Sequence, residues 1–113
     1  MVADEDLNRI RKDLSLFYEK ARAEYPIVKL FLFGSYAKGN PRRDSDIDVG
    51  VVIAASKIEN RIPIMSRLMY LAHTIDVNIE PYVICKGDYE SPEPGSILAE
   101  IVQTSKEIPI QAA

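Results

Sequence analysis

The sequence predicts a mixed α/β (α+β) fold in which helices pack against a small mixed β-sheet. Two apolar runs, 27–33 and 47–53, have the length and composition of buried strands. A segment of amphipathic helical periodicity precedes them and another follows. The chain has 113 residues, 47% of them hydrophobic, which is enough for one core. We therefore expect a single domain spanning residues 1–113.

The N-terminal third predicts a helix followed by an interior strand. Residues 4–24 carry apolar side chains at three- and four-residue spacing: Leu7, Ile10, Leu14, Phe17 and Ala21. Tyr25-Pro26 ends this helix, because the residue before a proline avoids helical dihedral angles. Strand 27–33 has two apolar faces, which indicates cover on both sides. The expected faces are Val28, Leu30 and Leu32 on one side, and Ile27, Phe31 and Phe33 on the other.

Two carboxylates stand at the start of the second strand. Strand alternation puts Asp46 and Asp48 on one face, with Gly50 and Val52. The other face consists of Ile47, Val49, Val51 and Ile53. Residues 63–73 predict a helix with proline in its first turn, long enough for a crossover between strands. Strand 75–84 follows, with Asp76 and Glu80 on one face.

The C-terminal third predicts smaller elements. Pro81 cannot donate a ladder hydrogen bond, so it indicates an edge strand or a bulge. Residues 86–95 predict a loop, Ser96 caps a short helix through Thr104, and 108–110 forms a small strand.

Composition narrows the class of protein. No apolar run reaches the roughly 20 residues of a membrane-spanning helix, so we expect no membrane association. The acidic N-terminus lacks a signal-peptide core and the single cysteine excludes an internal disulfide, so we expect a cytoplasmic protein. The net charge of −3 weighs against broad nucleic-acid binding. A local cluster of Lys38, Arg42 and Arg43 could still hold a small anion.

The stretch between the two strands carries the chemistry. Gly34-Ser35 ends the first strand, where glycine permits a sharp turn and close approach of a ligand. A nearby helix start would offer N–H groups to a phosphate, although Gly-Ser after a strand is more often only a turn. A P-loop is excluded, because residues 40–41 are Asn-Pro where Lys and Ser or Thr are needed.

Asp46 and Asp48 suit a divalent cation. Two carboxylates about 4 Å apart repel by roughly 4 kcal/mol at an effective dielectric constant near 20. Mg²⁺ removes that repulsion and completes its shell with water and phosphate oxygens. The alternative is that both carboxylates simply face solvent at the start of the strand and bind no cation. A calcium loop is excluded, because Val49 and Ala55 stand where it needs Gly and Glu.

Together, these features resemble the signature of polymerase-beta-type nucleotidyltransferases. The signature is an apolar strand, Gly34-Ser35, ten intervening residues, and Asp46-Ile47-Asp48 between apolar neighbours. The chain most resembles the minimal nucleotidyltransferases, small prokaryotic proteins little larger than the catalytic domain. The motif covers residues 33–49, and the order of elements extends the resemblance from about residue 7 to residue 110.

The resemblance implies roles for single residues. Gly34 and Ser35 would bind the triphosphate of ATP or another nucleoside triphosphate, helped by Lys38 and Arg43. Asp46 and Asp48 would hold one or two Mg²⁺ ions. The family usually adds a third carboxylate from a neighbouring strand. We favour Glu80, which opens a short apolar run, with Asp76 as the alternative.

The resemblance also implies a partner. The chain has no room for the domains that hold the acceptor in larger relatives, so we expect a homo- or hetero-oligomer. Minimal nucleotidyltransferases suggest a HEPN-type toxin protein that this chain, as antitoxin, modifies with AMP from ATP. The alternative is a non-catalytic module that binds nucleotide and metal and neutralises or scaffolds a partner protein.

Overall fold

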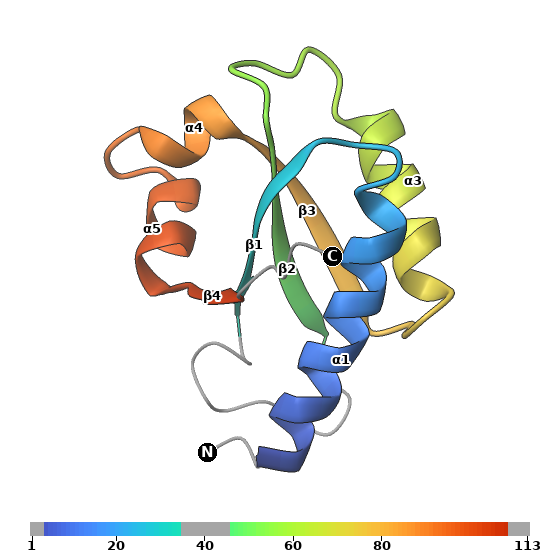
Figure 1. Ribbon diagram of the computed structural model, residues 1–113. Helices are drawn as coiled ribbons and strands as arrows, with labels where there is room; N and C mark the ends of the chain where they lie inside the picture. The colour runs from blue at the N-terminus through green and yellow to red at the C-terminus, as the bar shows by residue number, and fades with distance from the viewer. Residues whose placement is uncertain (1–3, 35–45, 109–113) are drawn as a thin grey trace.

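A four-stranded mixed sheet forms the centre of the protein (Figure 1). The computed structural model describes residues 4–34 and 46–108, with side chains described for 8–34 and 46–106. The strands, in the order in which they lie in the sheet, are β3 (Ile79–Cys85), β2 (Ile47–Ile53), β1 (Ile27–Phe33) and β4 (Lys106–Ile108). Strand β1 is antiparallel to both β2 and β4, whereas β2 and β3 are parallel. The predicted interior position of β1 and edge position of β3 are both confirmed.

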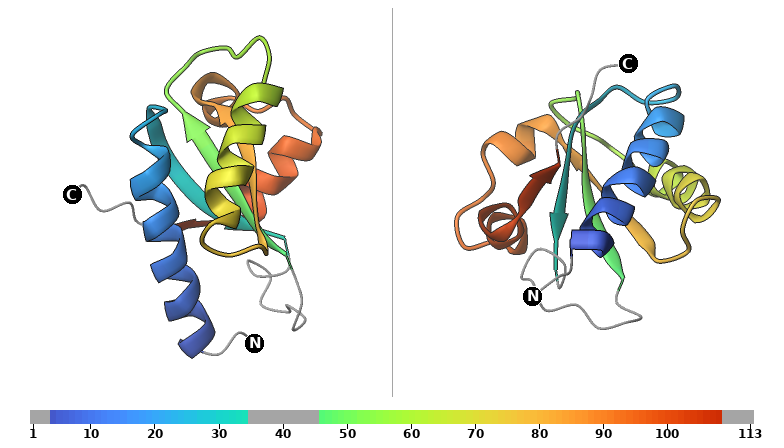
Figure 2. Two further views of the ribbon diagram at one scale, coloured as in Figure 1. Left: turned by 90° about the vertical axis from the view of Figure 1, so that its right-hand side faces the viewer. Right: turned by 60° about the horizontal axis from the view of Figure 1, so that its bottom comes forward.

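Helices cover both faces of the sheet. They are α1 (Asp4–Ala21), α3 (Ile62–His73), α4 (Lys86–Glu90) and α5 (Ile97–Thr104). Figures 1 and 2 show α1 and α3 on one face, with α4 and α5 on the other. Helix α3 connects the parallel strands β2 and β3, which confirms the predicted crossover. None of the described helices combines the length and the apolar character needed to cross a membrane.

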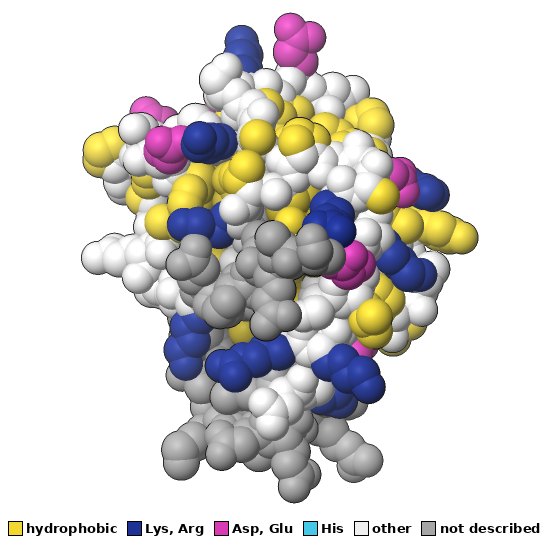
Figure 3. Space-filling view, viewed as in Figure 1, with side chains coloured by type: hydrophobic (Ala, Val, Ile, Leu, Met, Phe, Trp, Pro, Cys, Tyr) yellow, Lys and Arg dark blue, Asp and Glu magenta, His cyan; other side chains and the backbone are white. Residues whose placement is uncertain are grey.

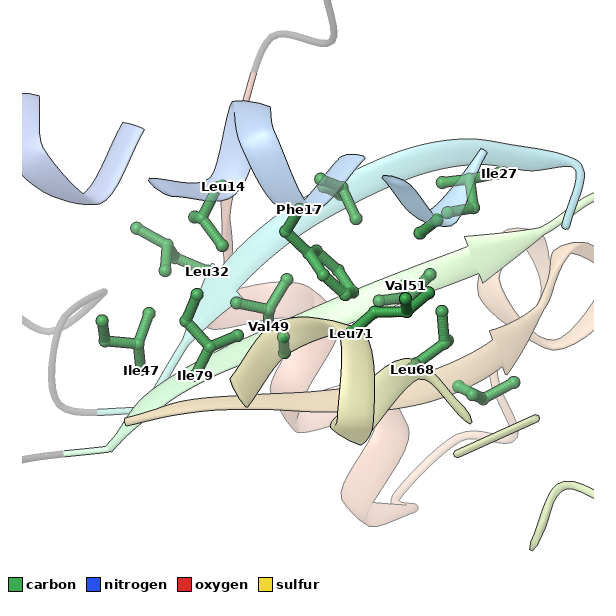
Figure 4. Close-up of a cluster of buried hydrophobic side chains, with 14 of the residues drawn as sticks. Leu14, Phe17, Ile27, Leu32, Ile47, Val49, Val51, Leu68, Leu71 and Ile79 are labelled. Atoms are coloured by element: carbon green, nitrogen blue, oxygen red, sulfur yellow. The ribbon is translucent and has the colours of Figure 1, made fainter. Parts of the chain in front are cut away.

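The larger core lies between the sheet and helices α1 and α3 (Figure 4). It combines alternate strand residues with the apolar stripes of the two helices. The side chains labelled in Figure 4 are Leu14, Phe17, Ile27, Leu32, Ile47, Val49, Val51, Leu68, Leu71 and Ile79. Each fully buried side chain of this size stabilises the fold by roughly 1.5–3 kcal/mol. This core fixes strand β2, which carries Asp48 and begins one residue after Asp46.

A smaller cluster lies on the opposite face. It consists of Phe31, Phe33, Val52 and Ile84, packed against side chains of α4 and α5. Gly50 is necessary for this packing, because a Cβ at that position would overlap the Phe31 ring. The cluster extends from α4 and α5 as far as Phe33, at the end of β1.

Strand β3 begins later than the sequence predicts. Residues 75–78 form a turn rather than part of the strand, because the Asp76 carboxylate accepts a hydrogen bond from the Asn78 N–H at 2.9 Å. The Ile79 N–H donates to the Asp76 carbonyl at 3.1 Å, which closes the turn. Val77, expected to alternate into a buried face, is 72% exposed. The prediction of a strand from residue 75 is therefore wrong for its first four residues.

Strand β1 contains a bulge. Ile27 pairs with Ile53 and Lys29 with Val52, so Val28 is an extra residue without a partner in β2. The bulge turns Ile27 into the larger core and leaves Val28 46% exposed. The predicted faces of strand 27–33 are therefore wrong for Ile27 and Val28, because a bulge moves residues before it to the other face.

The remaining boundaries differ by a few residues. Helix α1 ends at Ala21, whose carbonyl accepts hydrogen bonds from the N–H groups of Glu24 and Tyr25 in a turn. Part of the predicted loop 86–95 is the short helix α4. Ser96 caps α5 as predicted, because its hydroxyl accepts a hydrogen bond from the Ala99 N–H at 3.1 Å. Strand β4 is centred two residues earlier than expected.

Charge is unevenly distributed over the surface. The net charge is −3, yet Lys and Arg side chains gather over and beside α1 on the face that Figure 3 shows. The sequence of α1 contains four of them, Arg9, Arg11, Lys12 and Lys20, and Arg22 follows one residue beyond its end. Part of the acidic excess must therefore lie elsewhere, and three carboxylates gather at the start of β2 and β3.

Candidate functional site

Three strands meet at the candidate site. In the parallel pair β2 and β3, Asp48 lies directly opposite Glu80, and in the antiparallel pair Phe33 lies opposite Asp48. Asp46 precedes β2 by one residue and is exposed. The register therefore brings together Asp48 and Glu80, which are far apart in the sequence. These carboxylates lie on the face of the smaller cluster, at the end away from α4.

The folded protein disfavours the charged form of the Asp48 carboxylate. Burial, and then the negative charges of Glu80 and Asp46, raise the pKa of the Asp48 carboxyl from 3.8 to about 6. Among the described residues, no hydrogen-bond donor compensates the Asp48 carboxylate. A group of this kind favours either a proton or a cation, because each removes the repulsion.

Gly34 makes room for the Asp48 side chain. Its φ of +73° lies in the left-handed region, which disfavours residues with a Cβ. A Cβ at this position would also overlap Asp48 Oδ2. The glycine at the end of β1 therefore serves two purposes, since it turns the chain and leaves space beside the carboxylate.

Tyr82 adds a hydroxyl to the site. Strand alternation puts it on the same face as Glu80, and its hydroxyl donates to Glu80 Oε2 at 3.4 Å. Burial, and then the charges of Asp48 and Glu80, raise the pKa of the Tyr82 hydroxyl, so it remains a donor at neutral pH. Sequence reasoning missed Tyr82, although its place two residues after Glu80 was a usable signal.

Asp76 lies in a different environment. Its carboxylate binds the backbone of its own turn and forms a side-chain hydrogen bond with Asp13 of α1. Burial, and then the charge of Asp76, raise the pKa of Asp13. The structure therefore brings Glu80, and not Asp76, beside Asp48. Asp76 and Glu80 do not share a strand face as predicted, because β3 begins only at residue 79.

The donor set is suited to Mg²⁺. Within the described part of the chain, no three His, Cys, Asp or Glu side chains form a ready metal cage. Mg²⁺ rarely uses such a cage, because it typically takes one or two carboxylates and completes its octahedral shell with water and substrate phosphates. Asp48 and Glu80, with Asp46 close enough to raise the Asp48 pKa, match that pattern.

The other predicted ligand-binding residues lie outside the described part of the chain. These are Ser35, Lys38 and Arg43, in the segment between Gly34 and Asp46. Gly34 is the predicted phosphate-binding residue that the structure places, and it borders Asp48.

Comparison with known proteins identifies the family. The family model described as "Polymerase beta, Nucleotidyltransferase" matches residues 17–109. The chain belongs to this nucleotidyltransferase family. The resemblance inferred from Gly34-Ser35 and Asp46-Ile47-Asp48 is thereby confirmed, together with the polymerase-beta-like fold.

Solved structures share the nucleotidyltransferase fold. A candidate nucleotidyltransferase from Sulfolobus solfataricus is 25% identical, with a TM-score of 0.58, and 76% of each chain is covered. A chain of a toxin–antitoxin structure with AMP-PNP is 21% identical, with a TM-score of 0.61, and covers 89% of this chain and 73% of its own. A mutant of the toxin–antitoxin MntA-HpeT is 23% identical, with a TM-score of 0.53, covering 98% and 75%. No curated protein sequence matches the chain.

Proposed function

We propose that this nucleotidyltransferase transfers AMP from ATP to a HEPN-type partner protein in a Mg²⁺-dependent reaction, and acts as the antitoxin of that partner. Family membership supports nucleotidyl transfer. The toxin–antitoxin structures support a protein partner, and the AMP-PNP in one of them supports an adenine nucleotide. On this proposal the working form is a hetero-oligomer that includes the partner.

The observation that carries the proposal is the pairing of Asp48 with Glu80 across β2 and β3. Burial, and then the charges of Glu80 and Asp46, raise the pKa of the Asp48 carboxyl, so a cation bound there would be stabilised. A sheet gains no stability from such an arrangement unless a cation neutralises it. Gly34 lies against the Asp48 carboxylate, because a Cβ at its position would overlap Asp48 Oδ2.

The chain's residues divide the reaction between them. Asp46, Asp48 and Glu80 would hold Mg²⁺, which when bound neutralises charge that develops on the phosphate oxygens. Gly34, with Ser35, Lys38 and Arg43, would bind the triphosphate. An acceptor hydroxyl oxygen would form a bond to the α-phosphorus, and the bond from that phosphorus to the bridging oxygen would break.

The products are the AMP-modified acceptor, pyrophosphate and a proton. Pyrophosphate leaves with the bridging oxygen, and the acceptor hydroxyl gives up its proton. Solvent water would receive that proton, because Glu80 Oε2 accepts the Tyr82 hydroxyl and Oε1 would bind the cation. The protein accelerates the step by positioning the two reactants and by electrostatic stabilisation.

The test uses the co-expressed partner. The chain and the product of a neighbouring HEPN-type gene are purified together, and intact mass spectrometry measures AMP added to the partner in the presence of ATP and Mg²⁺. Asp48→Asn and Glu80→Gln should each lower transfer by at least about a hundredfold, because each removes charge from the proposed metal site. Asp76→Asn is the matched control. It keeps an oxygen for the Asn78 N–H and should transfer normally.

Two outcomes would contradict the proposal. A partner that stays unmodified in active cells, while the chain binds ATP and Mg²⁺, would favour the non-catalytic binding module. Loss of transfer in Asp76→Asn but not in Glu80→Gln would assign the third carboxylate to Asp76.

A further inference from the structure

Tyr82 and Phe33 form a bridge across strand β2. Tyr82 belongs to β3 and Phe33 to β1, with β2 between them. Their rings nevertheless meet edge to face, with centroids 5.1 Å apart and planes inclined at 64°. The β2 residue opposite Tyr82 is Gly50, and the one opposite Phe33 is Asp48. The bridge therefore lies beside the Asp48 carboxylate.

Gly50 makes this bridge possible. A Cβ at that position would overlap the Phe31 ring, on which Phe33 packs. Phe33 itself packs on Phe31, with ring centroids 5.9 Å apart, and Phe31 belongs to the smaller buried cluster. The Tyr82 ring is thus held by a row of aromatic side chains that ends in the protein interior.

The hydroxyl of this fixed ring meets Glu80. It donates to Glu80 Oε2 at 3.4 Å, so one carboxylate oxygen is engaged and Oε1 is left for another partner. A glutamate side chain has three rotatable bonds, and ordering it on binding costs conformational entropy. Ligating carboxylates are commonly oriented by a hydrogen bond of this kind from a neighbouring group.

We propose that Tyr82 is a positioning residue of the carboxylate site: its hydroxyl, held in place by the Phe33 ring, directs Glu80 toward Asp48 and the bound cation. The inference rests on the proposed function, because it assigns Glu80 to that cation. Tyr82 itself remains 39% exposed, so its hydroxyl can be removed without opening a buried cavity.

The test measures Mg²⁺ binding apart from catalysis. The melting temperature of the whole chain is followed against Mg²⁺ concentration at a fixed, saturating concentration of ATP. In Tyr82→Phe, which keeps the ring and its contact with Phe33, the half-maximal Mg²⁺ concentration should rise about tenfold, the lower end of the loss seen when such a partner is removed. The melting temperature without Mg²⁺ should stay at the wild-type value.

Tyr70→Phe is the matched control. Tyr70 is an exposed tyrosine on α3 that contacts Arg67, on an element outside the carboxylate site. It should show the wild-type Mg²⁺ requirement. A purely structural role of Tyr82 would instead lower the melting temperature equally at every Mg²⁺ concentration. Excess Mg²⁺ should restore the AMP transfer rate of Tyr82→Phe.

The outcomes separate this inference from the proposed function. If Tyr82→Phe needs no more Mg²⁺ than wild type, while Asp48→Asn loses the Mg²⁺ effect, the positioning role is wrong and nucleotidyl transfer is untouched. If Mg²⁺ and ATP stabilise the wild type without any transfer, the proposed reaction fails, and a shifted Mg²⁺ requirement in Tyr82→Phe still supports the positioning role. A wild type that Mg²⁺ does not stabilise overturns both.

Discussion

The two faces of the sheet differ in burial and charge, although the same strands form both. Strand β2 turns Ile47, Val49, Val51 and Ile53 toward α1 and α3, where all four are buried. Its alternate residues, Asp48, Gly50 and Val52, face the other way, and only Val52 lies in a buried apolar cluster. On the first face, which we call the closed face, all the β2 side chains are buried. On the second, the half-open face, apolar side chains are buried near α4 and α5, and carboxylates lie at the start of β2.

The difference explains how a small protein can hold adjacent negative charges. Burial of the Asp48 carboxylate, and repulsion from its neighbours, oppose folding. Burial of apolar side chains on the closed face of the same strand offsets this cost. The closed face should therefore govern stability, and the half-open face should govern ligand binding. Substitutions on each face can test this division.

The largest effect on stability should come from the closed face. Phe17 is fully buried between α1 and the sheet, so Phe17→Ala should lower the free energy of unfolding by about 3–5 kcal/mol. Urea denaturation measures this loss. Leu16→Ala, on the same helix but 48% exposed, is the control and should cost far less. Equal losses would mean that the closed face does not dominate stability.

A medium effect should come from the covered end of the other face. Gly50→Ala would drive a methyl group into the Phe31 ring and should cost about 1–3 kcal/mol through overpacking. The double variant with Phe31→Leu should lose less than the sum of the two single variants, because the smaller side chain leaves room. Strict additivity in urea denaturation would show that the two positions do not clash.

The smallest effect should come from the carboxylate end, with the opposite sign. The folded pKa of Asp48, about 6, lies above its ordinary value of 3.8, so protonation favours the folded state. The stability that protonation contributes is fully present below about pH 3.8 and is lost as pH rises through about 6. Asp48→Asn should therefore stabilise the metal-free protein at pH 7, by about 1 kcal/mol after allowance for solvent screening.

Unfolding free energies at several pH values between 4 and 7, without Mg²⁺, check this expectation. The advantage of Asp48→Asn over wild type should grow across that range. Asp46→Asn is the matched control, because Asp46 is exposed and should gain less. A variant Asp48→Asn that is less stable than wild type at pH 7 would show that the folded protein does not disfavour the charged Asp48 carboxylate.

Sequence patterns predicted the elements whose signals are local. The ranges of β1 and β2 agree with the structure, because each is an unbroken apolar run between polar or turn-forming neighbours. The sequence also predicted the helix cap, from the Ser96 hydroxyl, and the edge position of β3, from Pro81. The family followed from Gly34-Ser35 and Asp46-Ile47-Asp48, whose spacing is a property of the sequence itself.

The failures arise where two local signals compete. At residues 75–78, alternation favours a strand, but the Asp76 side chain stabilises a turn by accepting a backbone hydrogen bond. In β1, Ile27 and Val28 are both apolar, so the sequence does not show which of the two faces the larger core, and the bulge at Val28 stays hidden. Helix α4 contains glycine and aspartate, and its place depends on close packing of Gly87 against the Ser56 carbonyl.

The candidate site was predictable only in part. Alternation places Asp46 and Asp48 on one face, but the choice between Glu80 and Asp76 depends on where β3 begins. Pairing of Tyr82 with Phe33 depends on the register of three strands, which a single sequence does not contain. The roles of these residues in binding and transfer stay predictions.

The crossover through α3 has a consequence for the order of folding. Asp48 and Glu80 become neighbours only after the chain between β2 and β3 has folded back and the parallel pair has formed. Long-range pairing of this kind is among the slower events of folding, because loop closure precedes the contacts that reward it. A nascent chain whose β3 has not yet left the ribosome would expose Asp46 and Asp48 without Glu80 beside them. Occupation of the site would therefore report that the β2–β3 pair has formed.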